Sequence, residues 1–457
     1  MQSLILLIGM MLGISQAQTD WPQMKDKIDT FVNDILECRG VIGMNLAIVK
    51  DGDTQYTTGY GYADFENQVP NDGETIHFIS SVSKSFTVTL FATVIEEKGI
   101  SWDSLVTDLL PGFKFQDDER NKAIKLRDLL GHVTGFPERL PAPYDTNEEF
   151  VEIIQCTEPV MTTRESFCYV DSNYYLAGVI LEHLTGKPYR ELVKERIHAP
   201  LNMNTSFPSR AKTYDPSFDK WSYSHVIING TIVVNRQPWG REGDRTETLG
   251  AAAWGHMTTA EDMAEYMKFH LGAYRNDGST NPVVDPAILR EMYEPKESIS
   301  FYTSFAEIDG LEDLQETWRV YDYGMGFWIG NYKDTDFIQH GGFGSHQTIL
   351  TLFDDWNIGI YSSSNGPGGD EEVEIKIDPV TADLMMTKGC EKYILYPSGV
   401  ANSFVAQSTG ECYGCAKSVV FTSVSESGSS SFEGFSTLSI DGVKFRNSEI
   451  SSERECD

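Results

Sequence analysis

The sequence has few basic residues and no long apolar run. Its 457 residues include 36 Lys and Arg against 68 Asp and Glu, which gives a formal charge of -32. An excess of negative charge of this size disfavours nucleic acid and anionic membrane surfaces as partners. No stretch reaches the roughly 18 to 20 apolar residues that a membrane-spanning helix needs. We therefore expect a protein that neither binds nucleic acid nor enters a membrane.

Several motifs that mark common classes of protein are also missing. The chain has no tandem repeat, no phosphate-binding loop and no G-x-S-x-G nucleophile elbow, and the last absence excludes the α/β-hydrolase route. No acidic loop has EF-hand spacing, and Cys412-x-x-Cys415 has no second ligand pair nearby at zinc spacing. We therefore predict no cofactor and no discrete metal site. The acidic surface would still suit Ca²⁺ or a carbonate mineral phase, because calcium prefers carboxylate oxygens.

The N-terminus and two sequons are typical of an exported protein. Residues 1–17 contain an apolar run over 4–14 followed by Ser15-Gln16-Ala17, which fits a secretory signal cleaved after Ala17. Asn204-Thr-Ser and Asn229-Gly-Thr are candidate glycosylation sites. These features predict a secreted, extracellular protein.

Cysteine usage agrees with export. An odd number of cysteines in a secreted chain predicts disulfides with one thiol left over. Cys156 and Cys168 are close together and far from the others in sequence, so we expect them to pair. The seven positions are Cys38, Cys156, Cys168, Cys390, Cys412, Cys415 and Cys456.

The order of hydrophobic periodicities predicts an α+β fold. A hairpin is expected over 44–62, a mainly helical part over about 102–310 and an antiparallel meander over 323–363. Helices grouped between strands from both ends of the chain favour a central antiparallel sheet flanked by helices rather than βαβ alternation. Helices are expected at 24–37, 81–99, 126–130, 148–154, 173–185, 189–197, 260–271 and 380–390, and strands at 323–330, 337–341, 347–353 and 358–363, with a loop region over 206–250.

The C-terminal part differs in composition. Residues 416–457 contain 12 serines and few large apolar residues. We therefore expect one main domain over 18–390 and, over 391–457, a small β module or a partly disordered tail.

The segment 81–99 carries the first candidate for chemistry. Ser81-Val82-Ser83-Lys84 opens a helix that is apolar on two sides, and its spacing places the hydroxyl and the amine one turn apart on one face. A serine becomes a nucleophile when a base takes its proton, and burial at a helix N-terminus lowers the pKa of a lysine. The motif is short, however, and Ser217-Phe218-Asp219-Lys220 matches it too. The structural alternative is a capped helix start with a solvated lysine.

Two further residues could complete such a site. Tyr169 precedes the helix expected from 173, and its phenol could relay a proton if a cation lies near it. His340 is followed by Gly341 and Gly342 between two strands, where the glycines allow close approach and the imidazole offers charge or a hydrogen bond. Each also has a plain alternative, Tyr169 as a half-buried aromatic residue and His340 as a turn residue bonded to backbone.

Taken in order, these motifs resemble the β-lactamase-related serine hydrolases, the family of class C β-lactamases, DD-peptidases and similar esterases. The resemblance spans roughly residues 40–390 and rests on Ser-x-x-Lys at Ser81, Tyr-x-Asn as Tyr169-Val170-Asp171, and His340-Gly341-Gly342. Further landmarks of the family are LLGHVTGFP (129–137), YYLAGVILEHLTGKPY (174–189) and GHMTTAEDM (255–263).

The resemblance implies a role for each residue. Ser81 would attack an acyl carbonyl, Lys84 would take or shuttle its proton, and Tyr169 would act as general base and acid. His340 would assist the electrostatics and bind a substrate carboxylate. The oxyanion hole would be formed by the backbone N–H groups of Ser81 and Phe343, with Gly342 beside them.

Asp171 departs from the family pattern, which has Asn there. A carboxylate at this position should raise the pKa of Lys84 and weaken an amide contact to substrate, which makes β-lactam hydrolysis less expected than ester or amide hydrolysis. The chain is also similar to β-lactamase-related proteins of the gigasin type among oyster shell-matrix components, and this implies an extracellular location. The sequence thus leaves two hypotheses, a secreted serine hydrolase with a small-molecule or peptide-like acyl substrate, and an acidic matrix protein that keeps only the fold.

Overall fold

The structure is a computed structural model. It describes residues 21–137, 140, 144, 146–164, 167–207, 220–228, 231–235, 250–275, 283–295, 297–298, 318–332, 335–366 and 368–369, together with the strands 373–377, 384–388, 391–397, 403–408, 417–423, 438–440 and 443–447. The expected signal segment, Asn229 and Ser217 lie outside these residues.

A nine-stranded sheet forms the centre of the molecule, as the α+β prediction requires. Its order is β3-β2-β1-β13-β12-β11-β10-β9-β8, and every neighbouring pair is antiparallel. The N-terminal hairpin thus joins the C-terminal meander at the β1–β13 pair, which runs from Met44 opposite Ser364 to Lys50 opposite Ile358. The strands are β1 (Gly43–Lys50), β2 (Asp53–Asp64), β3 (Val69–Pro70), β8 (Glu297–Ser298), β9 (Trp318–Tyr323), β10 (Trp328–Tyr332), β11 (Thr335–Gly342), β12 (Gln347–Phe353) and β13 (Ile358–Ser364).

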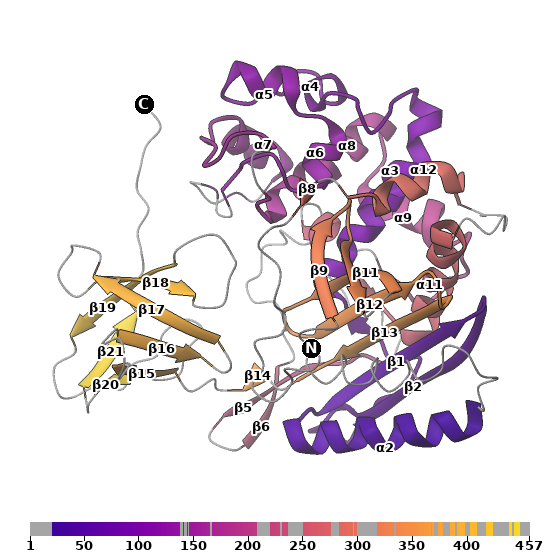
Figure 1. Cartoon of the computed structure of the whole chain (residues 1–457), viewed down its shortest axis with the longest axis vertical. Helices are drawn as coiled ribbons and strands as arrows, with labels where there is room; N and C mark the ends of the chain where they lie inside the picture. Colours follow the sequence, from indigo (N-terminus) through magenta and orange to yellow (C-terminus); the bar gives the residue numbers. More distant parts are fainter. Residues whose placement is uncertain are drawn as a thin grey trace.

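The alternation of side chains along β1 separates two cores. Leu46 and Ile48 pack with α2 (Trp21–Arg39) on one face, whereas Ala47 and Val49 belong to the large helical core on the other. All four side chains are fully buried, which explains the unbroken apolar run of a strand covered on both faces. In Figure 1, α2 lies along β1 and β2 while the helices drawn in purple gather on the opposite side of the sheet.

The helices between the two parts of the sheet agree with the expected periodicities at 126–130, 148–154, 173–185, 189–197 and 260–271. They are α4 (Val106–Leu109), α5 (Asp118–Ala123), α6 (Leu126–Leu130), α7 (Asn147–Gln155), α8 (Asp171–Thr185), α9 (Tyr189–Val193) with η3 (Lys194–His198), α10 (Ala251–Ala253), α11 (Ala260–Arg275) and α12 (Pro286–Arg290) with η5 (Glu291–Tyr293). No helix in the described part of the chain combines the length and the apolar character of a membrane span.

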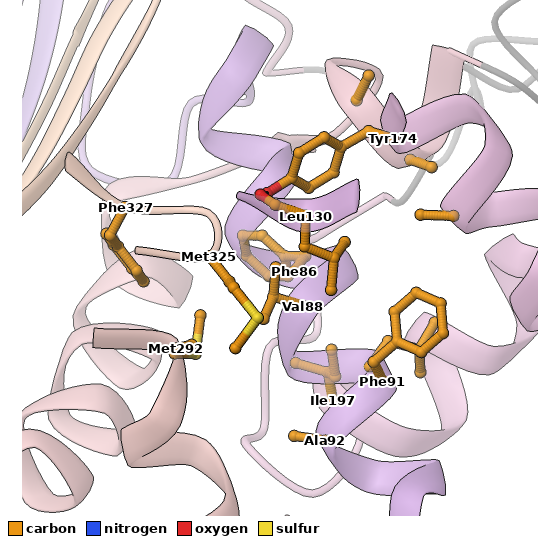
Figure 2. Packing of buried hydrophobic residues seen from close by; sticks show 14 of the residues in the cluster. Phe86, Val88, Phe91, Ala92, Leu130, Tyr174, Ile197, Met292, Met325 and Phe327 are labelled. Atoms are coloured by element: carbon orange, nitrogen blue, oxygen red, sulfur yellow. The ribbon is translucent and has the colours of Figure 1, made fainter. Parts of the chain in front are cut away.

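Helix α3 (Ser83–Lys98) lies at the centre of the large core. The turn η2 (Ser80–Val82) leads into it, and Gly99 ends it in the left-handed conformation, with φ +63°, that glycine adopts without strain. Twelve of its sixteen residues, from Ser83 to Ala92 and then Val94 and Ile95, are buried. Figure 2 shows side chains of α3 packed among those of other elements, with Phe86, Val88, Phe91 and Ala92 surrounded by Leu130, Tyr174, Ile197, Met292, Met325 and Phe327.

Three expectations about local structure are wrong. The run 323–330 is not one strand: Tyr323 ends β9, residues 324–327 form the turn, in which Gly326 has φ +76°, and β10 begins at Trp328. The expected loop region contains a hairpin of β5 (Ser224–Ile228) and β6 (Thr231–Asn235). The helix expected over 380–390 is instead the strand β16 (Leu384–Lys388).

That strand belongs to a closed barrel of seven strands in the order β15-β16-β17-β18-β19-β21-β20. A strand there is stabilised by pairing on both sides, with β15 (Val373–Ile377) and β17 (Glu391–Pro397), which sequence periodicity does not reveal. The β module therefore begins before residue 391. Its other strands are β18 (Ser403–Ser408), β19 (Lys417–Ser423), β20 (Leu438–Ile440) and β21 (Val443–Asn447).

Candidate active site

Ser81 lies in the turn η2, partly exposed, at the entrance to α3. The turn is held from inside by Ser83, whose hydroxyl donates to the Ser80 carbonyl at 2.6 Å and accepts the His256 N–H at 3.0 Å. Ser80 has φ +46°, a conformation that non-glycine residues rarely adopt. The fixed backbone presents the Ser81 hydroxyl at a defined place over the first turn of the helix.

Strand β11 lies directly against this turn because Gly342 has no side chain. A Cβ at Gly342 would overlap the carbonyl oxygen of Ile79 and come within 3.0 Å of the Cβ of Ser80. Phe343, which is 49% exposed, is the first residue after the strand. The structure thus brings the third motif to the serine, and the oxyanion role of the Ser81 and Phe343 N–H groups stays a prediction.

We expect Gly342→Ala to damage the site. The added methyl group must push β11 away from η2, and overpacking of this kind costs about 1–3 kcal/mol. The thermal midpoint should fall by several degrees and esterase activity by at least about tenfold, since an ångström-scale misplacement at a reacting centre costs up to about two powers of ten. Unchanged activity in a folded Gly342→Ala variant would contradict the argument that β11 must touch the turn.

Lys84 is fully buried one turn below Ser81. Its Nζ lies 3.2 Å from the Ser81 Oγ, 2.7 Å from the Asp171 Oδ1 and 3.1 Å from the Ala253 carbonyl oxygen. The structural alternative of a solvated lysine at a capped helix start is therefore wrong for this motif, and η2 and α3 have no side-chain cap.

The second Ser-x-x-Lys match is different. Lys220 forms surface ion pairs with Asp72, at 2.8 Å, and with Glu74. Ser217 lies outside the described residues.

The surroundings of Lys84 make its amine easier to deprotonate than that of a lysine in water. Burial lowers the pKa of Lys84, and the opposing effect of the Asp171 carboxylate does not cancel it. Once it has lost a proton, the amine keeps two N–H groups, which can donate to the Asp171 carboxylate and the Ala253 carbonyl. Its lone pair is then left for the third neighbour, the Ser81 hydroxyl, and this is the arrangement of a general base beside a nucleophile.

The expectation for Asp171 is thus correct in sign but incomplete. The carboxylate does raise the pKa of Lys84, as expected, yet burial outweighs it and the net shift is downward. Asp171 begins α8, and its side chain is 42% exposed while that of Lys84 is fully covered.

We expect Asp171→Asn to move the pH dependence of activity. Removing the carboxylate removes the influence that raises the pKa of Lys84, so the amine becomes neutral at lower pH. The ascending limb of a pH–kcat/KM profile should therefore shift toward lower pH. Glu97→Gln is the matched control, because it makes the same change of charge at the other end of α3, about 20 Å along the helix. A profile that stays in place in Asp171→Asn, or that moves equally in both variants, would contradict this.

Tyr169 joins the site just before α8. The Lys84 Nζ lies 4.7 Å from the centre of its ring. The ring stacks on Trp328 of β10, with centroids 6.0 Å apart and an interplanar angle of 12°, and lies 6.2 Å from the His340 ring. The Ser81 hydroxyl and the Tyr169 ring therefore lie close to the Lys84 amine, and the His340 ring lies next to that of Tyr169.

His340 is buried in a hydrogen-bonded position that fixes its tautomer. Its Nδ1 lies 2.7 Å from the Gly341 carbonyl oxygen, which can only accept, so Nδ1 carries the proton. Nε2 then accepts from the Tyr323 hydroxyl at 3.2 Å. Burial, aided by the charge of Lys84, lowers the pKa of His340 to about 3. That His340 binds a substrate carboxylate stays a prediction, in which one of its two hydrogen-bonded ring nitrogens would have to exchange its partner for the substrate.

The expected disulfide is also wrong. Cys156 is a free, exposed thiol at the C-terminal end of α7. Cys168 is buried, and its Sγ lies 3.5 Å from the Phe136 carbonyl oxygen. Proximity in sequence does not decide pairing, because here one side chain faces solvent and the other faces the interior. Asn204 lies at the surface, where a sequon can be modified, and its glycosylation stays a prediction.

Several residues of the site carried no signal in the sequence. The Ala253 carbonyl meets Lys84 only because α10 packs against α3, and backbone carbonyls leave no mark in a sequence. Trp328 and Tyr323 lie in the strands that were misplaced. His132 lies in the landmark LLGHVTGFP, which indicated importance without a role.

The fold and the pair of partly exposed Ser81 and buried Lys84 define the class of α+β proteins that carry a Ser-x-x-Lys site at the start of a central helix, with a strand of the sheet beside it. The family model described as Beta-lactamase matches residues 28–381, so the chain belongs to the Beta-lactamase family.

Curated relatives match part of the chain. It is 26% identical to Protein flp of Staphylococcus aureus over 254 residues, which are 54% of this chain and 49% of that protein. It is 28% identical to Teichoic acid D-alanine hydrolase of the same species over 205 residues, 44% of this chain and 49% of that protein. The chain thus spans about half the length of the curated relatives it matches.

Solved structures share the fold. The octameric penicillin-binding protein homologue from Pyrococcus abyssi has a TM-score of 0.62 and 21% identity, over 87% of this chain and 95% of that one. D-amino acid amidase from Ochrobactrum anthropi SV3 has a TM-score of 0.56 and 23% identity, over 74% and 89%.

Proposed function

We propose that this protein is a serine hydrolase that cleaves an ester or amide through an acyl-enzyme on Ser81. The observation that carries the proposal is the position of the Lys84 amine, buried between two fixed acceptors with its third direction toward the Ser81 hydroxyl. Lys84 is the one buried side chain of α3 that can carry a charge; the others are apolar or hydroxyl-bearing. A buried amine is costly, and such groups concentrate where chemistry needs a shifted pKa.

The proposed reaction has two balanced halves. The Ser81 Oγ attacks the carbonyl carbon while its proton passes to the Lys84 Nζ, and the resulting tetrahedral oxyanion collapses to an ester on Ser81. The leaving alcohol or amine takes that proton, directly or through the Tyr169 phenol. Water then attacks the acyl-enzyme, a proton returns to Ser81, and the acid is released.

The substrate is proposed to be a small or peptide-like acyl compound. The names of two relatives, a D-amino acid amidase and a teichoic acid D-alanine hydrolase, support amide and ester bonds as the target. The neutral state of His340 argues against recognition of a substrate carboxylate by that residue.

Covalent labelling tests the proposal. Purified protein treated with a fluorophosphonate probe and digested should carry the adduct on the peptide that contains Ser81, and heat-denatured protein should carry none. An adduct at another serine, or no adduct together with no turnover across panels of esters and D-amino acid amides, would overturn it.

We further propose that the protein is exported and acts outside the cell, with Ca²⁺ or carbonate mineral as a second contact. The charge of -32 and the two sequons support this. Protein recovered from the medium of secreting cells should begin at Gln18, and calcium-dependent binding to carbonate by the Ser81→Ala variant would favour the matrix role. A retained N-terminus of 17 residues on secreted protein would contradict the proposed signal.

A further inference from the structure

His132, in the landmark LLGHVTGFP, holds the segment around Tyr169 by two hydrogen bonds. Its carbonyl oxygen accepts the Cys168 N–H at 2.9 Å, and its Nδ1 accepts the Val170 N–H at 3.1 Å. The bonded residues lie immediately before and after Tyr169. One residue therefore fixes both backbone neighbours of the candidate general base.

The second bond requires a neutral ring in one tautomer. A backbone N–H can only donate, so Nδ1 must present its lone pair and the proton must lie on Nε2. The side chain is fully buried, and burial, with smaller contributions from Lys84 and His340, holds the pKa of His132 well below its usual range. The acceptor nitrogen is therefore available near neutral pH.

The ring of His132 also contacts the aromatic residues of the site. Its centroid lies 4.4 Å from that of Tyr169, 5.1 Å from Tyr174 and 5.2 Å from Tyr323. Tyr323 is the residue that donates to His340. His132 thus contacts the Tyr169 ring directly and is connected to His340 through Tyr323.

The backbone of His132 is in a conformation that ordinary residues avoid. Its φ is +60°, in the left-handed region. This turn directs the carbonyl and the imidazole of one residue to the same neighbouring segment. Backbone strain of this kind is found mainly at functional sites, where the surrounding contacts are strong enough to hold the residue in this conformation.

We propose that His132 is a positioning residue, whose carbonyl and Nδ1 clamp the backbone on both sides of Tyr169 and so hold its phenol beside Lys84. The inference rests on the proposed function, because the phenol matters only if Ser81 is acylated. His132 itself does not touch the reacting atoms. Its effect on the reaction comes from holding Tyr169 in position.

Two substitutions separate the clamp from the backbone strain. Glycine and asparagine both accept φ near +60°, but only asparagine has an acceptor, its Oδ1, close to the place of Nδ1. His132→Gly therefore removes the side-chain bond without adding strain, and His132→Asn restores it. Both variants lack the imidazole ring, so a difference between them reports the hydrogen bond.

Hydrogen exchange of a peptide covering 167–171 measures the clamp without any substrate. In His132→Gly we expect exchange at Val170 to become at least about tenfold faster, and in His132→Asn to stay near that of the wild type. Equal protection in wild type and His132→Gly would overturn the clamp. Loss of protection at Val170 in a folded His132→Asn variant would also overturn the clamp. This second result can be obtained even if the His132→Gly variant does not fold.

The rates of labelling and of turnover test whether these two hydrogen bonds matter for the reactivity of Ser81. The rate of fluorophosphonate labelling, and kcat for p-nitrophenyl acetate, should fall about ten- to a hundredfold in His132→Gly, with KM changed much less, and recover in large part in His132→Asn. Wild-type rates in a His132→Gly variant that has lost protection would overturn the positioning role. Failure of the proposed function would show itself differently, as absence of the Ser81 adduct in the wild type, and the exchange experiment would still decide whether His132 holds the segment.

Discussion

Ser81→Ala is expected to lower kcat for an ester substrate by at least about three powers of ten and to abolish fluorophosphonate labelling. The alanine variant keeps the turn, because Ser83 and not Ser81 holds η2 through its hydrogen bonds. What it removes is the atom that bonds to the acyl carbon, and loss of a nucleophile of this kind leaves only substrate binding and oxyanion stabilisation. The measurement is steady-state turnover alongside in-gel labelling, with the thermal midpoint as a check on folding.

The second Ser-x-x-Lys provides the matched control. Ser217→Ala makes the same substitution in the same four-residue motif, and turnover should stay at the wild-type level. Residual labelling of Ser81→Ala that maps to any other serine would contradict the assignment of the nucleophile.

Lys84→Met is expected to lower kcat/KM by at least about two powers of ten while the protein stays folded. Methionine has a similar length and suits a buried site, and the Asp171 left behind is 42% exposed and can be solvated. The loss comes from the proton acceptor beside Ser81, since general acid–base contributions are typically about two to four powers of ten. Fluorophosphonate labelling should slow by a comparable factor, because the same proton must leave the hydroxyl.

Lys220→Met is its control. Lys220 occupies the lysine position of the second motif but lies in surface ion pairs with Asp72 and Glu74, so turnover should be unchanged. If Lys84→Met retained wild-type kcat/KM, or if labelling of Ser81 kept its wild-type rate in that variant, the amine would not be the base.

Much of the fold could be predicted where apolar periodicity decided the element. Helix α3 is apolar on two sides and ends at Gly99, and both features are local. The hairpin of β1 and β2 and the strands β11 to β13 are equally clear in sequence, because alternation and turn residues mark them. Their pairing into one sheet was expected from the positions of strands at both ends of the chain, and the β1–β13 ladder confirms it.

The errors occurred where partners distant in sequence decide the structure. Residues 384–388 read as part of a helix because apolar residues in a short run fit either period, and pairing with β15 and β17 makes them a strand. Cys156 and Cys168 are neighbours in sequence, yet the end of α7 turns one to solvent while the other faces the core.

The site shows the same division. The sequence by itself determined which chemical groups are available, a hydroxyl and an amine one helical turn apart, because spacing on a helix is a local property. Only the tertiary structure decided the direction in which the pKa of the amine shifts. The Ala253 carbonyl, the Asp171 carboxylate and the packing that excludes water come from separate segments, and together they set the pKa of Lys84. His340 is neutral for the same reason: desolvation depends on everything packed around a group, and a sequence does not list the neighbours that folding supplies.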